Sequence, residues 1–191
     1  KKVIVDLSFI KSLSQRDISA GLAEVVKTGF IADRKILKLI DKPLENLEEL
    51  VYRSVKVKGN VVSKDFREGK LREILNYGHT LGHAIEKHSN YSVRHGEAVA
   101  IGMCFVAELA AAKIGLSQDV VQSHYKILKA LNLPTSYKKE AWSDLLGTMG
   151  LDKKVKSGVL RFVAIESVGK CVRIESPTID ELQAAYERIA Q

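Results

Sequence analysis

A long apolar segment places the strongest limit on how this chain can fold. Residues 95–114 read HGEAVAIGMCFVAELAAAKI, and apolar side chains fall on most sides of a helix with that span. A helix that is apolar all round is normally buried. Its longest apolar run, residues 98–107, is about half as long as a membrane span and is flanked by Glu97 and Glu108. We therefore predict that residues 95–114 form the central helix of a soluble multi-helix bundle.

The rest of the sequence predicts a mainly α fold with one short β-hairpin. Helical periodicity and capping signals indicate two helices within 16–40 and one each over 43–62, 79–87, 118–131 and from 179 onward. Residues 160–165 and 170–174 are typical of strands, and the turn between them predicts a hairpin. Residues 2–6 are also typical of a short strand. The length of 191 residues suits one good-sized domain with a small appendage.

Charge and cysteine usage narrow the classes of function. The net charge of +7 fits either a lysine-rich solvated surface or a positive cleft for an anionic substrate. Nucleic acid is disfavoured because the lysines are scattered and no aromatic-basic pattern accompanies them. Cys104 and Cys171 lack metal-binding spacing and suit a reducing cytoplasm. No Gly-x-Gly-x-x-Gly follows a strand, so the chain has no visible nucleotide-binding fingerprint of its own.

Three residues form a candidate metal set, namely Glu24, His79 and His95. One carboxylate and two imidazoles are a common catalytic zinc set, because they leave a coordination position open. His79 and His83 share a helix face with the spacing of a zincin, but Thr80 replaces the general-base glutamate of that motif. The histidine pair alone also fits a structural or surface role, and His95 a capping or loop role. Only structural roles are expected for His88 and His124.

Several charged residues near these segments could bind an anion. Lys58 shares a helical stripe with core-like valines, where a lysine either meets an anion or extends its ammonium to water. Glu24 and Lys27 form either a plain helical ion pair or a functional pair retained on a buried helix. Arg72 and Asn76 would face the same way as His79 if the helical phase extends back to them. Arginine suits two-pronged contact with a carboxylate or phosphate.

Four ordered stretches resemble the 3-dehydroquinate synthase family. They are AGLAEVVKTG, KGNVVSKDFREGKLREILNYGHTLGHAIE, RHGEAVAIGM and DKKVKSGVLRFVAIESVGK. The resemblance implies that Glu24, His79 and His95 bind a divalent metal, Zn²⁺ or Co²⁺. It also implies substrate contacts from Lys27, Lys58, Arg72, Asn76, His83 and one of Lys153 and Lys154.

The same resemblance implies a reaction and a cofactor. The family converts 3-deoxy-D-arabino-heptulosonate 7-phosphate to 3-dehydroquinate and phosphate in the shikimate pathway, which leads to chorismate and the aromatic amino acids. A ring hydroxyl is transiently oxidised with NAD while phosphate is eliminated. Family members carry a Rossmann-like NAD domain ahead of this region. Residues 1–10 are therefore expected to be its last strand and a linker, and residues 11–191 the α-helical metal- and substrate-binding domain.

Further expectations follow from the resemblance. The full-length enzyme would be a cytoplasmic homodimer, and the chain alone would be inactive because NAD binds mainly elsewhere. Two alternatives remain: a related sugar-phosphate cyclase or metal-dependent polyol dehydrogenase of the same fold, and a non-enzymatic metal-binding or folding module. Lys58, Asn76 and His83 favour the dehydroquinate reaction because they suit an acidic substrate.

Overall fold

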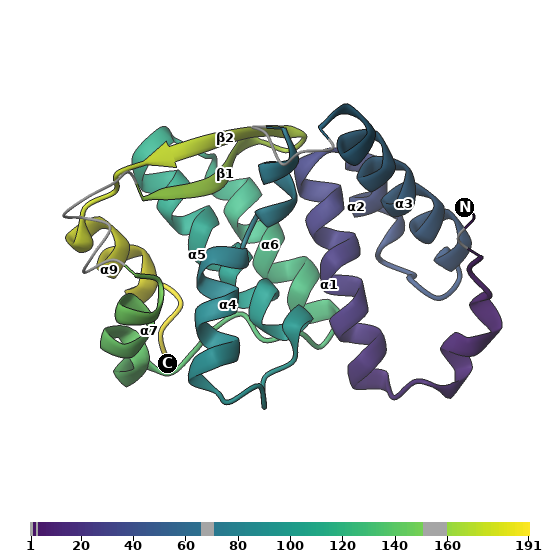
Figure 1. The fold of residues 1–191 in the computed structure, drawn as a ribbon, viewed down its shortest axis with the longest axis horizontal. Coiled ribbons are helices and arrows are strands. Elements are labelled where there is room, and N and C mark those ends of the chain that lie inside the picture. Colours follow the sequence, from purple (N-terminus) through teal and green to yellow (C-terminus); the bar gives the residue numbers. More distant parts are fainter. Residues whose placement is uncertain (1, 3, 66–70, 151–159) are drawn as a thin grey trace.

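The fold is a helical bundle with a β-hairpin lying across one end (Figure 1). A computed structural model describes residues 2, 4–65, 71–150 and 160–191. The longer elements are α1 (Gln15–Ile31), α2 (Arg34–Leu39), α3 (Leu47–Lys64), α4 (His79–His88), α5 (His95–Ile114), α6 (Gln118–Ala130), α7 (Trp142–Thr148), β1 (Arg161–Ser167), β2 (Lys170–Glu175) and α9 (Ile179–Glu187). Short 3-10 helices are η1 (Leu7–Ser12), η2 (Arg72–Asn76) and η3 (Lys139–Ala141). None of the helices in these described ranges combines the length and apolarity that crossing a membrane requires.

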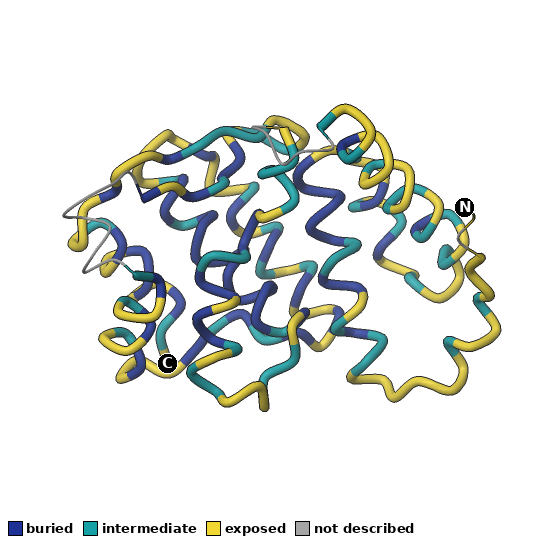
Figure 2. The backbone as a smooth tube through the Cα atoms, in the orientation of Figure 1, coloured by how far each residue is buried: buried dark blue, intermediate teal, exposed yellow. Residues whose placement is uncertain are grey.

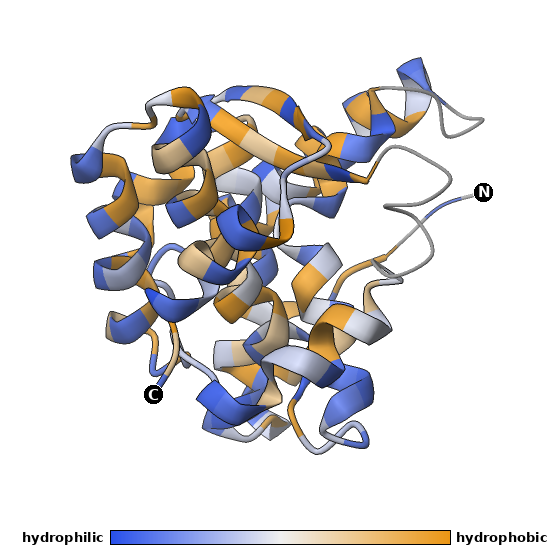
Figure 3. Ribbon diagram, turned by 90° about the vertical axis from the view of Figure 1, so that its left-hand side faces the viewer, coloured by the Kyte–Doolittle hydropathy of each residue, from blue (hydrophilic) through white to orange (hydrophobic). Residues whose placement is uncertain are grey.

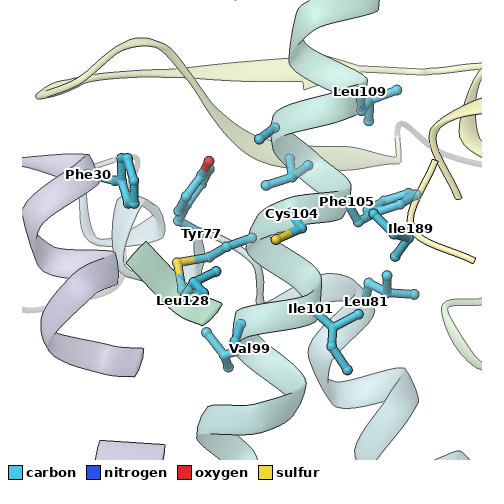
Figure 4. Packing of buried hydrophobic residues seen from close by; sticks show 14 of the residues in the cluster. Phe30, Tyr77, Leu81, Val99, Ile101, Cys104, Phe105, Leu109, Leu128 and Ile189 are labelled. Carbon is cyan, nitrogen blue, oxygen red and sulfur yellow. The ribbon is translucent and has the colours of Figure 1, made fainter. Parts of the chain in front are cut away.

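Helix α5 forms the centre of the bundle, as the sequence predicts. It contacts α1, α4, α6, α9 and β1, and residues 98–107 are all buried (Figure 2). Figure 4 shows Phe30 and Tyr77 on one side of α5 and Ile189 on the other. In Figure 3, blue and orange segments alternate along the outer helices, which have one face in water. The polar site residues must therefore lie at the ends or outer faces of helices packed on α5.

The predicted hairpin is confirmed. Strands β1 and β2 pair antiparallel, with Phe162 opposite Ile174, and Gly169 takes φ +85° in the connecting turn. The buried face of β1 packs on α5, where the Phe105 and Phe162 ring centroids lie 5.9 Å apart. The predicted capping box of the last helix is also confirmed, since Thr178 and Glu181 cap each other's backbone N–H groups.

Two predictions about the helix expected over 43–62 are wrong, namely its first residue and its inward face. The helix begins at Leu47, because the Asn46 side chain donates to the carbonyls of Leu39 and Lys42 and stabilises a turn there. Its predicted inward valine stripe does not face the core either: Val55 is 59% exposed. Leu50 and Val61 are the buried residues of α3. The helix packs on α1 and α2 by a different face from the one that periodicity alone selected.

The strand predicted for residues 2–6 is not formed at its described positions, residue 2 and residues 4–6. A strand needs a neighbouring strand to satisfy its backbone groups. Within the described ranges, only β1 and β2 form a sheet. The chain instead enters η1, whose first turn is capped by the Asp6 side chain.

Candidate metal and substrate site

The three predicted metal ligands converge from three helices. Glu24 lies within α1, while His79 and His95 are the first residues of α4 and α5. The Nε2 atom of His79 lies 3.7 Å from Glu24 Oε1, and the Nε2 atom of His95 lies 3.6 Å from the same oxygen. One ligand atom from each residue falls within 4.8 Å of the others. Atoms bound at about 2.0–2.2 Å to one ion are separated by comparable distances.

Close packing of α5 on α1 brings His95 to Glu24. A Cβ at Gly96 would lie 1.9 Å from the Ala20 carbonyl oxygen, so only glycine allows this approach. Glu97 secures the same junction. It accepts from the Arg94 backbone N–H at 3.0 Å and from Arg16 Nη2 of α1 at 2.6 Å. In the Arg-His-Gly-Glu segment, the histidine is therefore a candidate ligand, and the glycine and glutamate position it.

His79 is oriented by a sharp turn before α4. Gly78 has φ +78° and separates η2 from α4. The condition that the helical phase extends back from His79 to Arg72 is therefore not met. The turn brings the Tyr77 carbonyl oxygen to 3.0 Å from His79 Nδ1. A carbonyl can only accept, so Nδ1 carries the hydrogen and Nε2 keeps its lone pair toward Glu24. This is the tautomer that a metal ligand requires.

The two oxygens of Glu24 have different environments. Oε2 accepts from Lys27 Nζ at 2.6 Å, whereas Oε1 is buried without a hydrogen-bond partner among the described residues. Burial tends to raise the pKa of Glu24, but the charge and hydrogen bond of Lys27, with smaller contributions from His79 and His95, hold it below its usual value. A buried carboxylate oxygen without a partner is costly unless a cation meets it. The residues therefore fit a divalent ion held by one oxygen and two nitrogens, with a coordination position open.

Burial also sets the charges of the neighbouring groups. Lys27 is 5% exposed, and burial lowers its pKa despite the ion pair with Glu24. Burial, followed by the Lys27 charge, lowers the pKa of His79 to about 4. His79 is therefore neutral at physiological pH, which keeps its Nε2 lone pair available to a metal.

A cleft of about 790 Å³ opens beside the three candidate ligands. Its lining contains seven residues predicted from sequence, namely Glu24, Lys27, Lys58, Arg72, Asn76, His79 and His95. Lys58 is exposed on the cleft wall, so the predicted stripe that it shares with core valines is wrong, although Lys58 does line the cleft beside the candidate ligands. The positive charge of Lys58 contributes to the lowered pKa of Lys27, because the two ammonium groups repel each other across the cleft wall. Such a wall suits an anionic ligand.

His83 lies beside the cleft rather than in its lining. Its ring centroid is 5.2 Å from that of His79 and 6.0 Å from that of His95. The structure adds Glu86, whose Oε1 lies 3.2 Å from His95 Nδ1 and which the sequence reasoning missed. Residues 79, 83 and 86 share one face of α4, so helical spacing could have indicated it. Lys153 and Lys154 lie outside the described residues.

The two remaining histidines have structural roles, as expected, but both have partners. His124 is fully buried, stacks on Phe30 at 3.5 Å between centroids, and its Nε2 accepts from the Tyr77 hydroxyl at 2.9 Å. His88 Nδ1 lies 2.9 Å from the Tyr137 hydroxyl. The partner of His124 is not visible in the sequence, because Tyr77 is distant along the chain and only folding brings it to α6.

Comparison with known families agrees with this geometry. The family described as 3-dehydroquinate synthase C-terminal matches residues 21–155, a range that contains all three candidate ligands. The chain belongs to the 3-dehydroquinate synthase family. It is 49% identical to the 3-dehydroquinate synthase of Corynebacterium diphtheriae, over 98% of this chain and 54% of that protein. The enzyme of Rhodococcus opacus is 47% identical over 99% of this chain and 53% of its own length.

Solved structures show that the fold is shared more widely. A 2-epi-5-epi-valiolone synthase from Streptomyces hygroscopicus, with NAD⁺ and Zn²⁺ bound, superposes with a TM-score of 0.84 at 22% identity, covering 96% of this chain and 54% of that one. A 2-deoxy-scyllo-inosose synthase complexed with carbaglucose-6-phosphate, NAD⁺ and Co²⁺ gives 0.75 at 25% identity, covering 91% and 52%. The chain thus spans about half the length of the family relatives that it matches.

Proposed function

We propose that this chain supplies the metal- and substrate-binding half of a 3-dehydroquinate synthase, acting in the cytoplasm on the shikimate pathway. The substrate would be 3-deoxy-D-arabino-heptulosonate 7-phosphate and the products 3-dehydroquinate and phosphate. One observation carries the proposal: Glu24, His79 and His95 converge at the wall of a cleft that also contains Lys27, Lys58 and Arg72. The 49% identity to an enzyme of that name supports the choice of substrate.

The cations and amide of the cleft would bind the substrate's acidic groups. Its carboxylate and phosphate need several donors, and Lys58, Arg72 and Asn76 present ammonium, guanidinium and amide groups on one wall. Lys27 would contribute from the floor, where burial keeps its ammonium close to the bound anion. Single contacts of this kind position a substrate more than they activate it. His83 would contact the substrate from the rim of the site.

The metal would sit against Glu24 Oε1 and the two Nε2 atoms. When bound, a divalent ion supplies Lewis acidity to an oxygen of the substrate. The chain's own residues prepare that position: Tyr77 fixes the tautomer of His79, and Lys27 occupies the second oxygen of Glu24. Zn²⁺ and Co²⁺ both accept such a nitrogen and oxygen donor set.

NAD would bind mainly to a preceding domain, and the full-length enzyme would be a homodimer. The relatives are about twice as long as the matched region, and the chain has no nucleotide-binding fingerprint of its own. On this proposal residues 1–10 are the connection to that domain. The isolated chain should then release no dehydroquinate or phosphate from the substrate, whereas the full-length protein should release both. Turnover by the isolated chain would contradict this division of the active site.

A related sugar-phosphate cyclase is the second candidate, because the 2-epi-5-epi-valiolone synthase structure superposes with a TM-score of 0.84. The two functions can be separated by assaying the full-length protein with NAD⁺ and Zn²⁺. We expect phosphate release from 3-deoxy-D-arabino-heptulosonate 7-phosphate and little from sedoheptulose 7-phosphate, which lacks the carboxylate. The reverse preference would assign the chain to the second function.

A further inference from the structure

Glu86 makes a contact that neither the metal set nor the cleft explains. Its Oε1 lies 3.2 Å from His95 Nδ1, and its side chain is 15% exposed. Glu86 belongs to α4 and His95 begins α5, so the contact joins the ends of two helices that pack along each other. A largely buried carboxylate in this place stabilises one orientation of the imidazole ring.

The contact fixes which nitrogen of His95 carries the hydrogen. An ionised carboxylate only accepts hydrogen bonds, so Nδ1 must donate to Glu86. The lone pair then remains on Nε2, which lies 3.6 Å from the unpartnered Oε1 of Glu24. His79 is held in the same tautomer, but by the Tyr77 backbone carbonyl. The two histidines are thus oriented by different means, one by the main chain and one by a side chain that mutation can remove.

We propose that Glu86 is a positioning residue that orients His95 and raises its basicity toward the divalent metal, an inference that rests on the metal site proposed above. A carboxylate that accepts the second N–H of a ligating histidine commonly strengthens metal binding. His83, Glu86 and His95 also lie within metal-binding distance of one another. A metal held by those three residues would take the Glu86 carboxylate as a ligand, whereas here that carboxylate accepts from His95 Nδ1. Among the described residues, the buried carboxylate oxygen without a partner belongs to Glu24 and not to Glu86.

The experiment compares Co²⁺ and Zn²⁺ binding by the full chain and by Glu86→Ala and Glu86→Gln. We expect Glu86→Ala to weaken binding about 10- to 100-fold at an unchanged stoichiometry of one. Glu86→Gln, which retains an acceptor without the charge, should lose less. The absorption spectrum of bound Co²⁺ should differ between the wild type and Glu86→Ala, a response that a merely structural role would not produce.

Glu73→Gln is the matched control. Glu73 lies in the lining of the cleft beside the metal set, and its carboxylate pairs with Arg173 rather than with a candidate ligand. Its metal affinity should stay close to that of the wild type. Equal metal affinity of Glu86→Ala and wild type would overturn the role of Glu86. A wild type that binds two ions and a Glu86→Ala variant that binds one would also overturn it, because Glu86 would then be a ligand of the second ion. Absence of metal binding by the wild type would instead reject the proposed metal site. If Glu86→Ala does not fold in chelator, the comparison rests on Glu86→Gln, and an unchanged affinity there overturns the proposal.

Discussion

Lys27 Nζ lies 2.6 Å from Oε2 of Glu24, while Oε1 of the same carboxylate faces two histidine nitrogens. The ion pair therefore leaves one oxygen for a metal and keeps the carboxylate ionised. It also keeps a cation next to the cleft that would receive the substrate. This ion pair, between residues three apart on α1, thus links the candidate metal set to the cleft that would receive the substrate.

Loss of either candidate ligand should remove the metal. We expect Glu24→Ala and His95→Ala each to lower Zn²⁺ affinity by at least about 100-fold, more than the loss of a group that only supports a ligand. Turnover of the full-length protein should fall with it. Metal content after dialysis and a competition titration measure the effect. Glu45→Ala, an exposed glutamate on the surface, should bind metal normally. Unchanged metal content in both ligand variants would reject the assignment.

The α1–α5 junction should tolerate no side chain at Gly96. A methyl group there would overlap the Ala20 carbonyl, so we expect Gly96→Ala to lower the free energy of unfolding by about 1–3 kcal/mol or more. Metal affinity should fall too, because His95 would move away from Glu24. Gly21→Ala is the control on α1. Its Cβ meets nothing within 4 Å, and alanine in a helix should raise stability by up to about 1 kcal/mol. Chemical denaturation in chelator checks both, and equal responses would contradict the packing argument.

Stability should fall in mild acid because of His124. Burial lowers its pKa from 6.5 to about 4, so the unfolded chain binds the proton at a higher pH than the folded chain. The free energy of unfolding should therefore decrease as the pH falls from about 6.5 to about 4, by on the order of 3 kcal/mol from this residue. His79 adds a similar loss in the metal-free protein, since its pKa is also about 4.

Denaturation curves at several pH values, recorded in chelator, test this contribution. His124→Gln should flatten the dependence between pH 6.5 and 4, whatever its effect on stability at neutral pH. Parallel curves for wild type and His124→Gln would show that His124 does not titrate in this way.

Lys58 should contribute to anion binding although it is exposed. A charge-assisted contact is worth about 1.5–3 kcal/mol, so Lys58→Gln should raise the substrate KM of the full-length protein roughly 10-fold or more. Lys56→Gln is matched in charge and helix. Its ammonium lies 5.6 Å from the Tyr52 ring centroid and outside the cleft lining, so its KM should not change. Equal effects of the two substitutions would indicate a general charge effect rather than a contact in the cleft.

Local sequence was sufficient for most elements of the fold. The bounds of α5 agree with the prediction because its apolar character is independent of its neighbours. The hairpin and the capping box at Thr178 follow from short-range turn and capping chemistry. The predicted strand over residues 2–6 is wrong, because a strand depends on a partner that local sequence cannot supply.

The sequence by itself determined which residues could bind a metal and an anion, through residue type, spacing and family resemblance. Only the tertiary structure decided how they act together. Helices α2, α3 and α4 lie between Glu24 and His95 in the sequence, and the approach of the two residues depends on close contact between Gly96 and the α1 backbone. The packing of α3 placed Lys58 on the cleft wall instead of in the core. Helical spacing places Glu86 on the face of α4 that carries His79 and His83, but its contact with His95 depends on the ends of α4 and α5 meeting in space.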